Sequence, residues 1–166
     1  MEKKLLYIVC SLLFFNSFKK DVRVNYVYAK QDLNGTTDAN KLISDTVLVK
    51  IADNIALKWN KKSNSLIKDS NYYNYLKNKN TLRLITESIA STADLGVLVC
   101  SKKKGHLKVG DVAFLYLLEN RKFYLFQCLK IQFDVLDKDC KIPRFLLDYI
   151  DKNRHTVGKK VSECMI

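Results

Sequence analysis

The residues with the clearest chemical role in this 166-residue chain are four cysteines that could form disulfide bonds: Cys100, Cys128, Cys140 and Cys164. A fifth, Cys10, lies inside an N-terminal apolar run. If the segment holding Cys10 is removed, an even number remains, which in an oxidising compartment predicts two disulfide bonds. Three pairings are open. Cys128 and Cys140 flank one short segment, so theirs is the pairing to test first; buried free thiols are the alternative. The spacings match no zinc motif, and we expect no metal and no cofactor.

Histidines and acidic residues give weaker signals. Nucleophilic catalysis needs a Cys or Ser beside a His and an orienting carboxylate. His106 follows a lysine run, and His155 lies in the polar part of the last predicted helix, so we expect no catalytic residue.

Asp134, Asp137 and Asp139 stand close to Pro143 in the sequence. A calcium loop would need a Gly at the bend and a later bidentate Glu, and neither is present. We expect Asp137 or Asp139 to cap the helix that begins near Pro143, because acids are favoured at helix N-termini.

Lysine dominates the charge. The net charge is +12, and 24 of the 29 basic residues are Lys. Such a field favours acidic partners, whereas specific phosphate and base recognition relies on Arg. A solvated Lys-rich surface is the alternative, and aromatics among lysines are also typical of single-strand nucleic-acid binders. The candidate partner-binding residues are Lys102, Lys103, Lys104, Tyr72, Tyr73, Lys77 and Lys79.

Residues 1–29 are signal-peptide-like. A cationic start, Met1–Lys4, precedes the apolar run Leu5–Phe15, the layout of an export signal. The run is about half the roughly twenty residues that a membrane-spanning helix needs, so we expect no transmembrane span in the mature protein. The alternative is a buried core element of a cytoplasmic protein.

The rest of the chain predicts a mainly α fold: a single compact domain of about five helices over 36–166, with at most one short strand pair. One proline and five glycines supply few turns, which favours helices. Apolar periodicity predicts helices over 38–60, 63–77, 81–93, 112–119 and 143–160. Three segments are less regular: 22–28 suits a short strand, 95–100 a strand or a helix continuation, and 122–135 an extended segment or apolar loop.

Three motifs carry a resemblance. K-V-G-D-V-A-F at 108–114, Q-F-D-V at 132–135 and I-P-x-x-L-L-x-Y-I-x-x-N-R at 142–154 together resemble an uncharacterised family of small exported bacterial proteins. The resemblance covers about Leu82 to Val161. It implies a mostly helical exported protein and no particular activity.

These observations support three functional hypotheses. The first is an exported, periplasmic or secreted, non-enzymatic interaction protein, immunity-like or adaptor-like, whose basic surface binds an acidic protein or an anionic envelope surface. The second is a small envelope hydrolase that uses carboxylates. The third is a cytoplasmic Lys-rich nucleic-acid-binding protein, which requires residues 5–15 to belong to the core.

Overall fold

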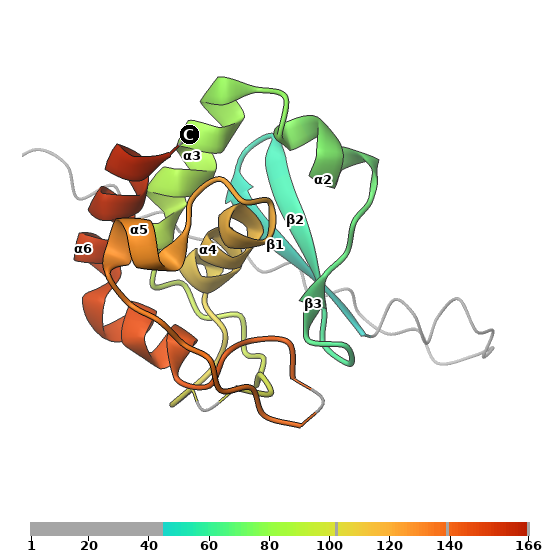
Figure 1. Ribbon diagram of the computed structural model, residues 1–166. Coiled ribbons are helices and arrows are strands. Elements are labelled where there is room, and N and C mark those ends of the chain that lie inside the picture. Colours follow the sequence, from blue (N-terminus) through green and yellow to red (C-terminus); the bar gives the residue numbers. More distant parts are fainter. Residues whose placement is uncertain (1–44, 102, 139, 166) are drawn as a thin grey trace, which may run out of the picture. The chain divides into compact units, whose positions relative to one another are not determined.

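The first elements that the structure describes are strands where the sequence predicts a helix. The computed structural model describes residues 45–101, 103–138 and 140–165, so the leader over 1–29 and the strand over 22–28 lie outside the described residues (Figure 1). Strand β1 (Thr46–Ala52) pairs antiparallel with β2 (Ile55–Asn60), and the short β3 (Ser65–Leu66) pairs with the end of β2. The helix predicted over 38–60 is therefore wrong where the structure describes it.

The spacing of the apolar residues explains this error. Val47, Ile51, Ile55 and Trp59 recur every four residues, which keeps side chains on one face of a helix and equally on one face of a strand. In the hairpin Val47 pairs with Trp59 and Val49 with Leu57. Trp59 and Leu57 are both buried, so the hairpin contributes one face to the core.

Two short helices follow, each with a side-chain cap. In α2 (Ser70–Tyr75) the Asp69 carboxylate accepts the Tyr72 N–H at 2.9 Å, and in α3 (Lys79–Glu87) the Asn78 side chain accepts the Thr81 N–H at 3.1 Å. These caps satisfy N–H groups that a helix leaves unpaired in its first turn. The 3₁₀-helix η1 (Ser88–Ala90) continues α3. The helices predicted over 63–77 and 81–93 are present but shorter.

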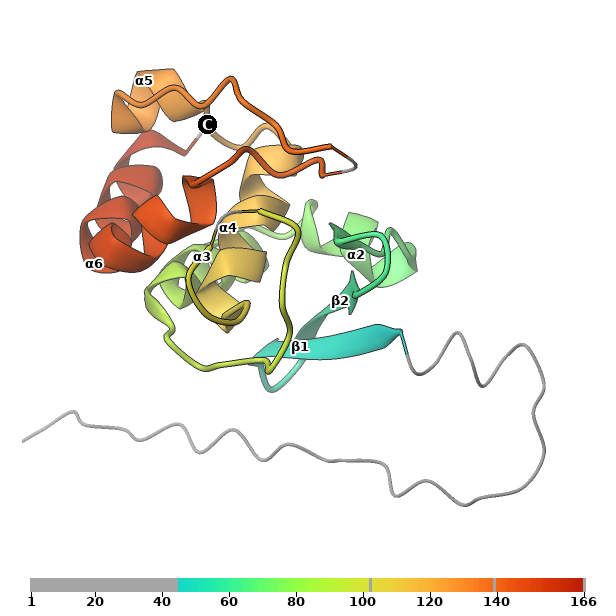
Figure 2. The same cartoon turned by 90° about the horizontal axis from the view of Figure 1, so that it is seen from below.

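Helix α4 (Val109–Glu119) is the centre of the domain. Its first six residues are all buried, and it packs against β1, α3 and α6. Figures 1 and 2 show it between the sheet and α6. A helix that is apolar on nearly all sides belongs in a core, and the prediction over 112–119 is confirmed.

The last part holds α5 (Leu125–Leu129) and α6 (Leu146–Cys164), joined by a long loop. Helix α5 occupies a segment predicted to be extended or irregular, and 95–100 contains no strand. Helix α6 begins three residues after Pro143 and kinks at Asn153, whose side chain donates to the Tyr149 carbonyl.

The fold class is confirmed: the described residues form a single domain of five α-helices with a small three-stranded antiparallel sheet. None of the helices in this described part combines the length and the apolar character that crossing a bilayer requires.

Candidate functional site

Two disulfide bonds join the cysteines of the last 67 residues of the chain. Cys100 pairs with Cys140 and Cys128 with Cys164, with Cα–Cα distances of 5.5 and 5.8 Å that are usual for disulfides. The prediction that these four cysteines form two bridges is confirmed, and the pairing of Cys128 with Cys140 is wrong. The physical reason is that α5 carries Cys128 against the last turn of α6. Two bridges indicate a protein of an oxidising compartment.

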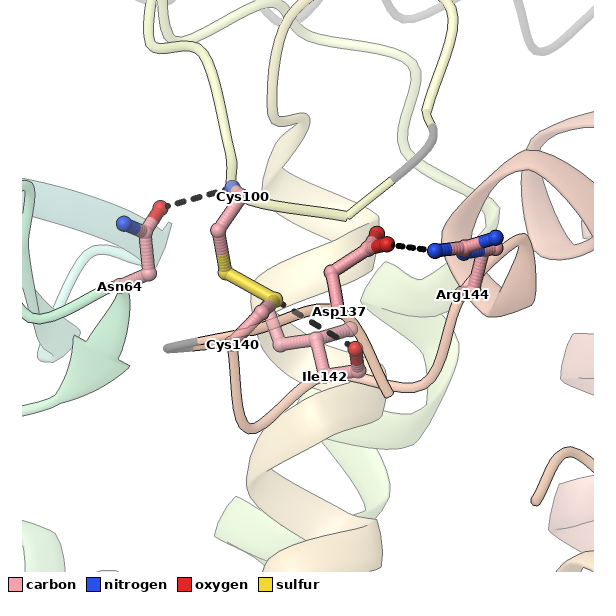
Figure 3. The surroundings of a disulfide bond; sticks show 6 residues. All are labelled: Asn64, Cys100, Asp137, Cys140, Ile142 and Arg144. Atoms are coloured by element: carbon pink, nitrogen blue, oxygen red, sulfur yellow. Dashed lines mark hydrogen bonds and ion pairs between the residues drawn. A yellow bond between two sulfur atoms is a disulfide. The ribbon is translucent and has the colours of Figure 1, made fainter. Parts of the chain in front are cut away.

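The Cys100–Cys140 bridge anchors the segment that we call the 131–145 loop (Figure 3). The Asn64 side chain accepts the Cys100 N–H at 3.2 Å, which ties the bridge to the turn between β2 and β3. Within the loop, Arg144 N–H donates to the Val135 carbonyl at 2.7 Å.

Asp137 does not cap α6, in contrast to the prediction. Its carboxylate pairs with the Arg144 guanidinium across the base of the loop, and Asp139 lies outside the described residues (Figure 3). Phe145 is the N-cap residue of α6, and within the described part of the chain its side chain makes no capping hydrogen bond.

An open hollow of about 380 Å³ lies on the 131–145 loop. It is lined by Gln132, Phe133, Asp134, Val135, Arg144 and Phe145. Beside it Val135, Leu136 and Phe145 keep 58%, 54% and 53% of their surface exposed. Exposed apolar residues that gather around a concavity mark binding sites more often than scattered ones do.

Phe145 has an unusual backbone at the edge of this hollow. Its φ is +66°, in the left-handed region, and a bulky residue adopts that conformation only when its surroundings impose it. Strain of this kind costs about 1–3 kcal/mol and gathers at functional sites.

A buried ion network lies where α4 meets α6. The Arg154 guanidinium donates to Asp111 at 2.8 Å and to Asp151 at 2.6 Å. The ammonium of Lys103 lies 3.3 Å from each of these carboxylates, and that of Lys108 lies 2.7 Å from Asp151. The side chains of Lys103 and Asp111 are completely buried. Three cations thus enclose two carboxylates.

This network suits a structural role better than a catalytic one. Burial by itself raises the pKa of the Asp151 carboxyl, but hydrogen bonds from Arg154 and Lys108 outweigh it and hold that pKa below its ordinary value. A general acid needs the opposite shift. The Asp111 carboxylate also accepts the Lys108 N–H at 2.9 Å, which fixes the first turn of α4.

A second polar network joins α2 to the C-terminus of α4. The Tyr72 hydroxyl donates to Glu119 at 3.2 Å and accepts from the Asn120 side chain at 2.7 Å, while the Tyr116 hydroxyl donates to the Tyr72 carbonyl at 2.8 Å. Lys68 pairs with Glu119 at 2.6 Å. Tyr72 is 2% exposed, and burial raises the pKa of its phenol.

The basic end is our name for the surface around this contact, made of Tyr73, Lys77, Lys79, Arg121 and Lys122. Tyr73 is 51% exposed beside the buried Tyr72, and the two lysines at the start of the α3 region are exposed. Arg121 and Lys122 directly follow Asn120, which contacts Tyr72. Across the described chain, none of these four cations has a carboxylate within ion-pair distance.

The structure separates the residues predicted to bind a partner. Tyr73, Lys77 and Lys79 belong to the basic end, whereas Tyr72 is a core residue and is unavailable for contact. In the lysine run, Lys103 is buried in the ion network and Lys104 is exposed beside α6, while Lys102 lies outside the described residues. Sequence reasoning missed Arg121, Lys122 and the hollow.

The histidines lie apart from the cysteines. His106 contacts Asp94 at 3.1 Å on the surface, and His155 is exposed on α6. Among the described residues no group of three His, Cys, Asp or Glu side chains is placed to hold a metal ion. Comparison with known proteins found no matching family model, no similar curated protein and no similar solved structure.

Proposed function

We propose that the chain is an exported, non-enzymatic binding protein whose basic end docks an acidic protein. The observation that carries the proposal is a set of cations around an exposed aromatic that have no ion-pair partner among the described residues. At the same contact Lys58 and Lys68 are paired with Asp69 and Glu119, so their charges are largely neutralised. The charges of the basic end remain available.

The composition supports a protein partner. Tyr is enriched at protein interfaces because it combines a large apolar ring with a hydroxyl, and Tyr73 offers both. The basic end holds one Arg, so it offers a single planar guanidinium fork of the kind that recognises phosphate bidentately. The disulfides support export to the periplasm or beyond, in line with the export signal predicted at the N-terminus.

Charge reversal tests this proposal. Poly-glutamate serves as the acidic probe, and its Kd is measured across a salt series, with a DNA oligonucleotide and anionic vesicles as competing probes. We expect the double variant Lys77→Glu, Lys79→Glu to weaken poly-glutamate binding about tenfold, or about 1.4 kcal/mol. The matched control is Lys159→Glu, Lys160→Glu, which changes the net charge equally on α6 and should stay within twofold.

Three outcomes would contradict the proposal. Equal weakening in both double variants would mean that only net charge matters. Tighter binding to DNA, or to vesicles, would name a different class of partner. Finding the protein in the cytoplasm of its host with an intact N-terminus would refute the proposal that it is exported.

A further inference from the structure

We propose that the outward side of α5 is a second docking surface, which seats the domain on an anionic lipid surface. We call it the α5 surface, and it consists of Tyr124, Phe126 and Lys130, with Arg121 and Lys122 at its border. The two border cations also belong to the basic end, but the α5 surface uses none of the other residues of that end. Its occupant is lipid rather than protein, so it adds to the proposed function.

Helix α5 is attached to the domain along one side. Leu125 and Leu129 pack on the core, and Cys128 is bonded to Cys164 at the end of α6. Figures 1 and 2 show α5 at the margin of the domain, beside α6. The other side of α5 therefore faces solvent on a crosslinked support.

Two aromatic rings project from this outward side. Tyr124 is 46% exposed and Phe126 is 64% exposed. Burial of such rings away from water is favourable, and the fold leaves much of both uncovered. A convex helix side with projecting rings fits a deformable lipid surface, where a Phe ring enters the boundary of the acyl chains and a Tyr ring lies at the level of the headgroups.

The cations around the rings select an anionic surface. Among the described residues, Arg121, Lys122 and Lys130 have no carboxylate within ion-pair distance, and residues 120–133 contain no acidic side chain. The Lys130 ammonium lies 5.9 Å from the centre of the Phe126 ring. Because long cationic side chains keep their charge in water while apolar groups beside them are buried, this pair suits both depths of a lipid interface.

The backbone at the two ends of this segment supports a role for its cations outside the fold. Arg121 and Lys130 both have a positive φ, at +53° and +56°. Gly adopts this region without steric cost, whereas residues with a Cβ atom adopt it at a cost in stability. Neither cation makes an ion pair in the part of the chain that the structure describes, so the fold gains no salt bridge in return. An anionic surface would use both charges.

Co-flotation with vesicles tests the proposal on the disulfide-bonded protein. Vesicles of phosphatidylcholine with about one third phosphatidylglycerol should bind it at least about tenfold more tightly than pure phosphatidylcholine does, and added salt should weaken the binding. Phe126→Ser should weaken binding to the anionic vesicles about tenfold. The matched control is Leu48→Ser, because Leu48 is also 64% exposed but lies on β1, across α4 from α5 (Figure 2). This control should change the binding less than about twofold.

A fluorescence measurement separates insertion of the ring from attraction by charge alone. Phe126→Trp should bind the anionic vesicles as wild type does, and its emission should shift to the blue and be quenched by brominated acyl chains. Trp59, the native Trp, is 1% exposed and supplies a constant background. Leu48→Trp is the control and should show neither change.

Lys130→Gly should move binding and stability in opposite directions. It removes one cation, which should weaken binding to the anionic vesicles about fivefold, and it relieves the positive φ, which should raise the urea midpoint. A purely structural role of Lys130 predicts instead that stability falls, and that result would contradict the use of its charge outside the fold.

The two docking proposals fail separately. Lys77→Glu, Lys79→Glu should weaken vesicle binding no more than the α6 pair Lys159→Glu, Lys160→Glu does, and Phe126→Ser should leave poly-glutamate binding unchanged. Any vesicle binding that remains in Phe126→Ser belongs to the basic end. Vesicle binding that survives Phe126→Ser in full, or the absence of a blue shift, would overturn lipid docking by α5. Loss of poly-glutamate binding in Phe126→Ser would overturn it too, because it would assign α5 to the acidic protein.

Discussion

At Gly110, tight packing and helix propensity predict opposite effects of a substitution by Ala on the stability of the protein. Gly110 lies in the first turn of α4, where a Cβ atom would be 2.3 Å from the Ile89 carbonyl oxygen, 2.4 Å from Nη1 of Arg154 and 2.7 Å from the Ser91 carbonyl oxygen. Two of these atoms are backbone. The third belongs to a side chain whose same nitrogen donates to Ile89 at 3.1 Å.

Gly110→Ala should therefore destabilise the protein by about 3 kcal/mol. Overpacking in a close-packed site costs about 1–3 kcal/mol. Moving Arg154 away from the Ile89 carbonyl loses a hydrogen bond to a charged group, which contributes about 1.5–3 kcal/mol. The higher helix propensity of Ala offsets these costs by about 1 kcal/mol.

Gly158 provides the matched control, because a Cβ atom added there in α6 would make only ordinary van der Waals contacts. Its nearest neighbours would be side-chain atoms of Ile89 at 3.8 Å, an ordinary contact distance. Urea unfolding of both variants with intact disulfides should move the midpoints in opposite directions, with Gly158→Ala more stable than wild type by up to about 1 kcal/mol. A Gly110→Ala variant as stable as wild type would refute the close approach of α4 to η1 and Arg154.

Three further predictions follow from the bridges, the ion network and the strained residue. Replacing either cysteine pair by Ser should lower the free energy of unfolding in urea by about 4 kcal/mol, because the loops span 40 and 36 residues. The pKa of Asp151 is lowered in the folded state, so its contribution is present above the ordinary Asp pKa near 3.9 and is lost as the pH falls below it; Asp151→Asn should flatten the acid limb of the stability curve. Phe145→Gly should be more stable than Phe145→Ala by about 1 kcal/mol, because both lose the ring and only Gly tolerates the positive φ.

Each of these has a clear contrary result. After alkylation, an equal mass with and without prior reduction would mean that the four cysteines are free thiols and that no bridge forms. An acid limb unchanged by Asp151→Asn would place the titrating groups elsewhere, with Asp69, Asp94 and Asp148 next because their pKa values are also lowered. Equal unfolding midpoints for the two Phe145 variants would show that the backbone there relaxes out of the left-handed region.

The sequence predicts the helices that are strongly apolar or regularly striped and misjudges segments whose pattern fits two structures. Helix α6 has a regular buried stripe, which its helical period predicts, and α4 is apolar on nearly all sides, as a core helix is. In 46–60 the four-residue spacing cannot separate a helix from a hairpin. The pair Asp53-Asn54, which begins the turn between the strands, is the signal that decides for the hairpin.

The candidate sites depend on contacts that no local pattern encodes. Lys103 looks like its neighbours in a lysine run, yet its side chain is buried because Asp111 on α4 and Asp151 on α6 both face it. Tyr72 and Tyr73 are adjacent, and only the position of α4 makes one buried and the other exposed. The disulfide pairing likewise follows from how α5 lies against α6.

The disulfide pairing determines which fragments stay linked when a protease cuts the chain. Because Cys100 joins Cys140 and Cys128 joins Cys164, the two closed rings interlock along the chain. A single cut anywhere between Cys100 and Cys164 leaves the fragments covalently linked, so a nicked 131–145 loop stays attached to the domain. The hairpin, α2 and α3 precede both crosslinks, so one cut just before Cys100 releases Tyr73, Lys77 and Lys79 once packing fails and separates them from Arg121 and Lys122, which stay in the crosslinked part.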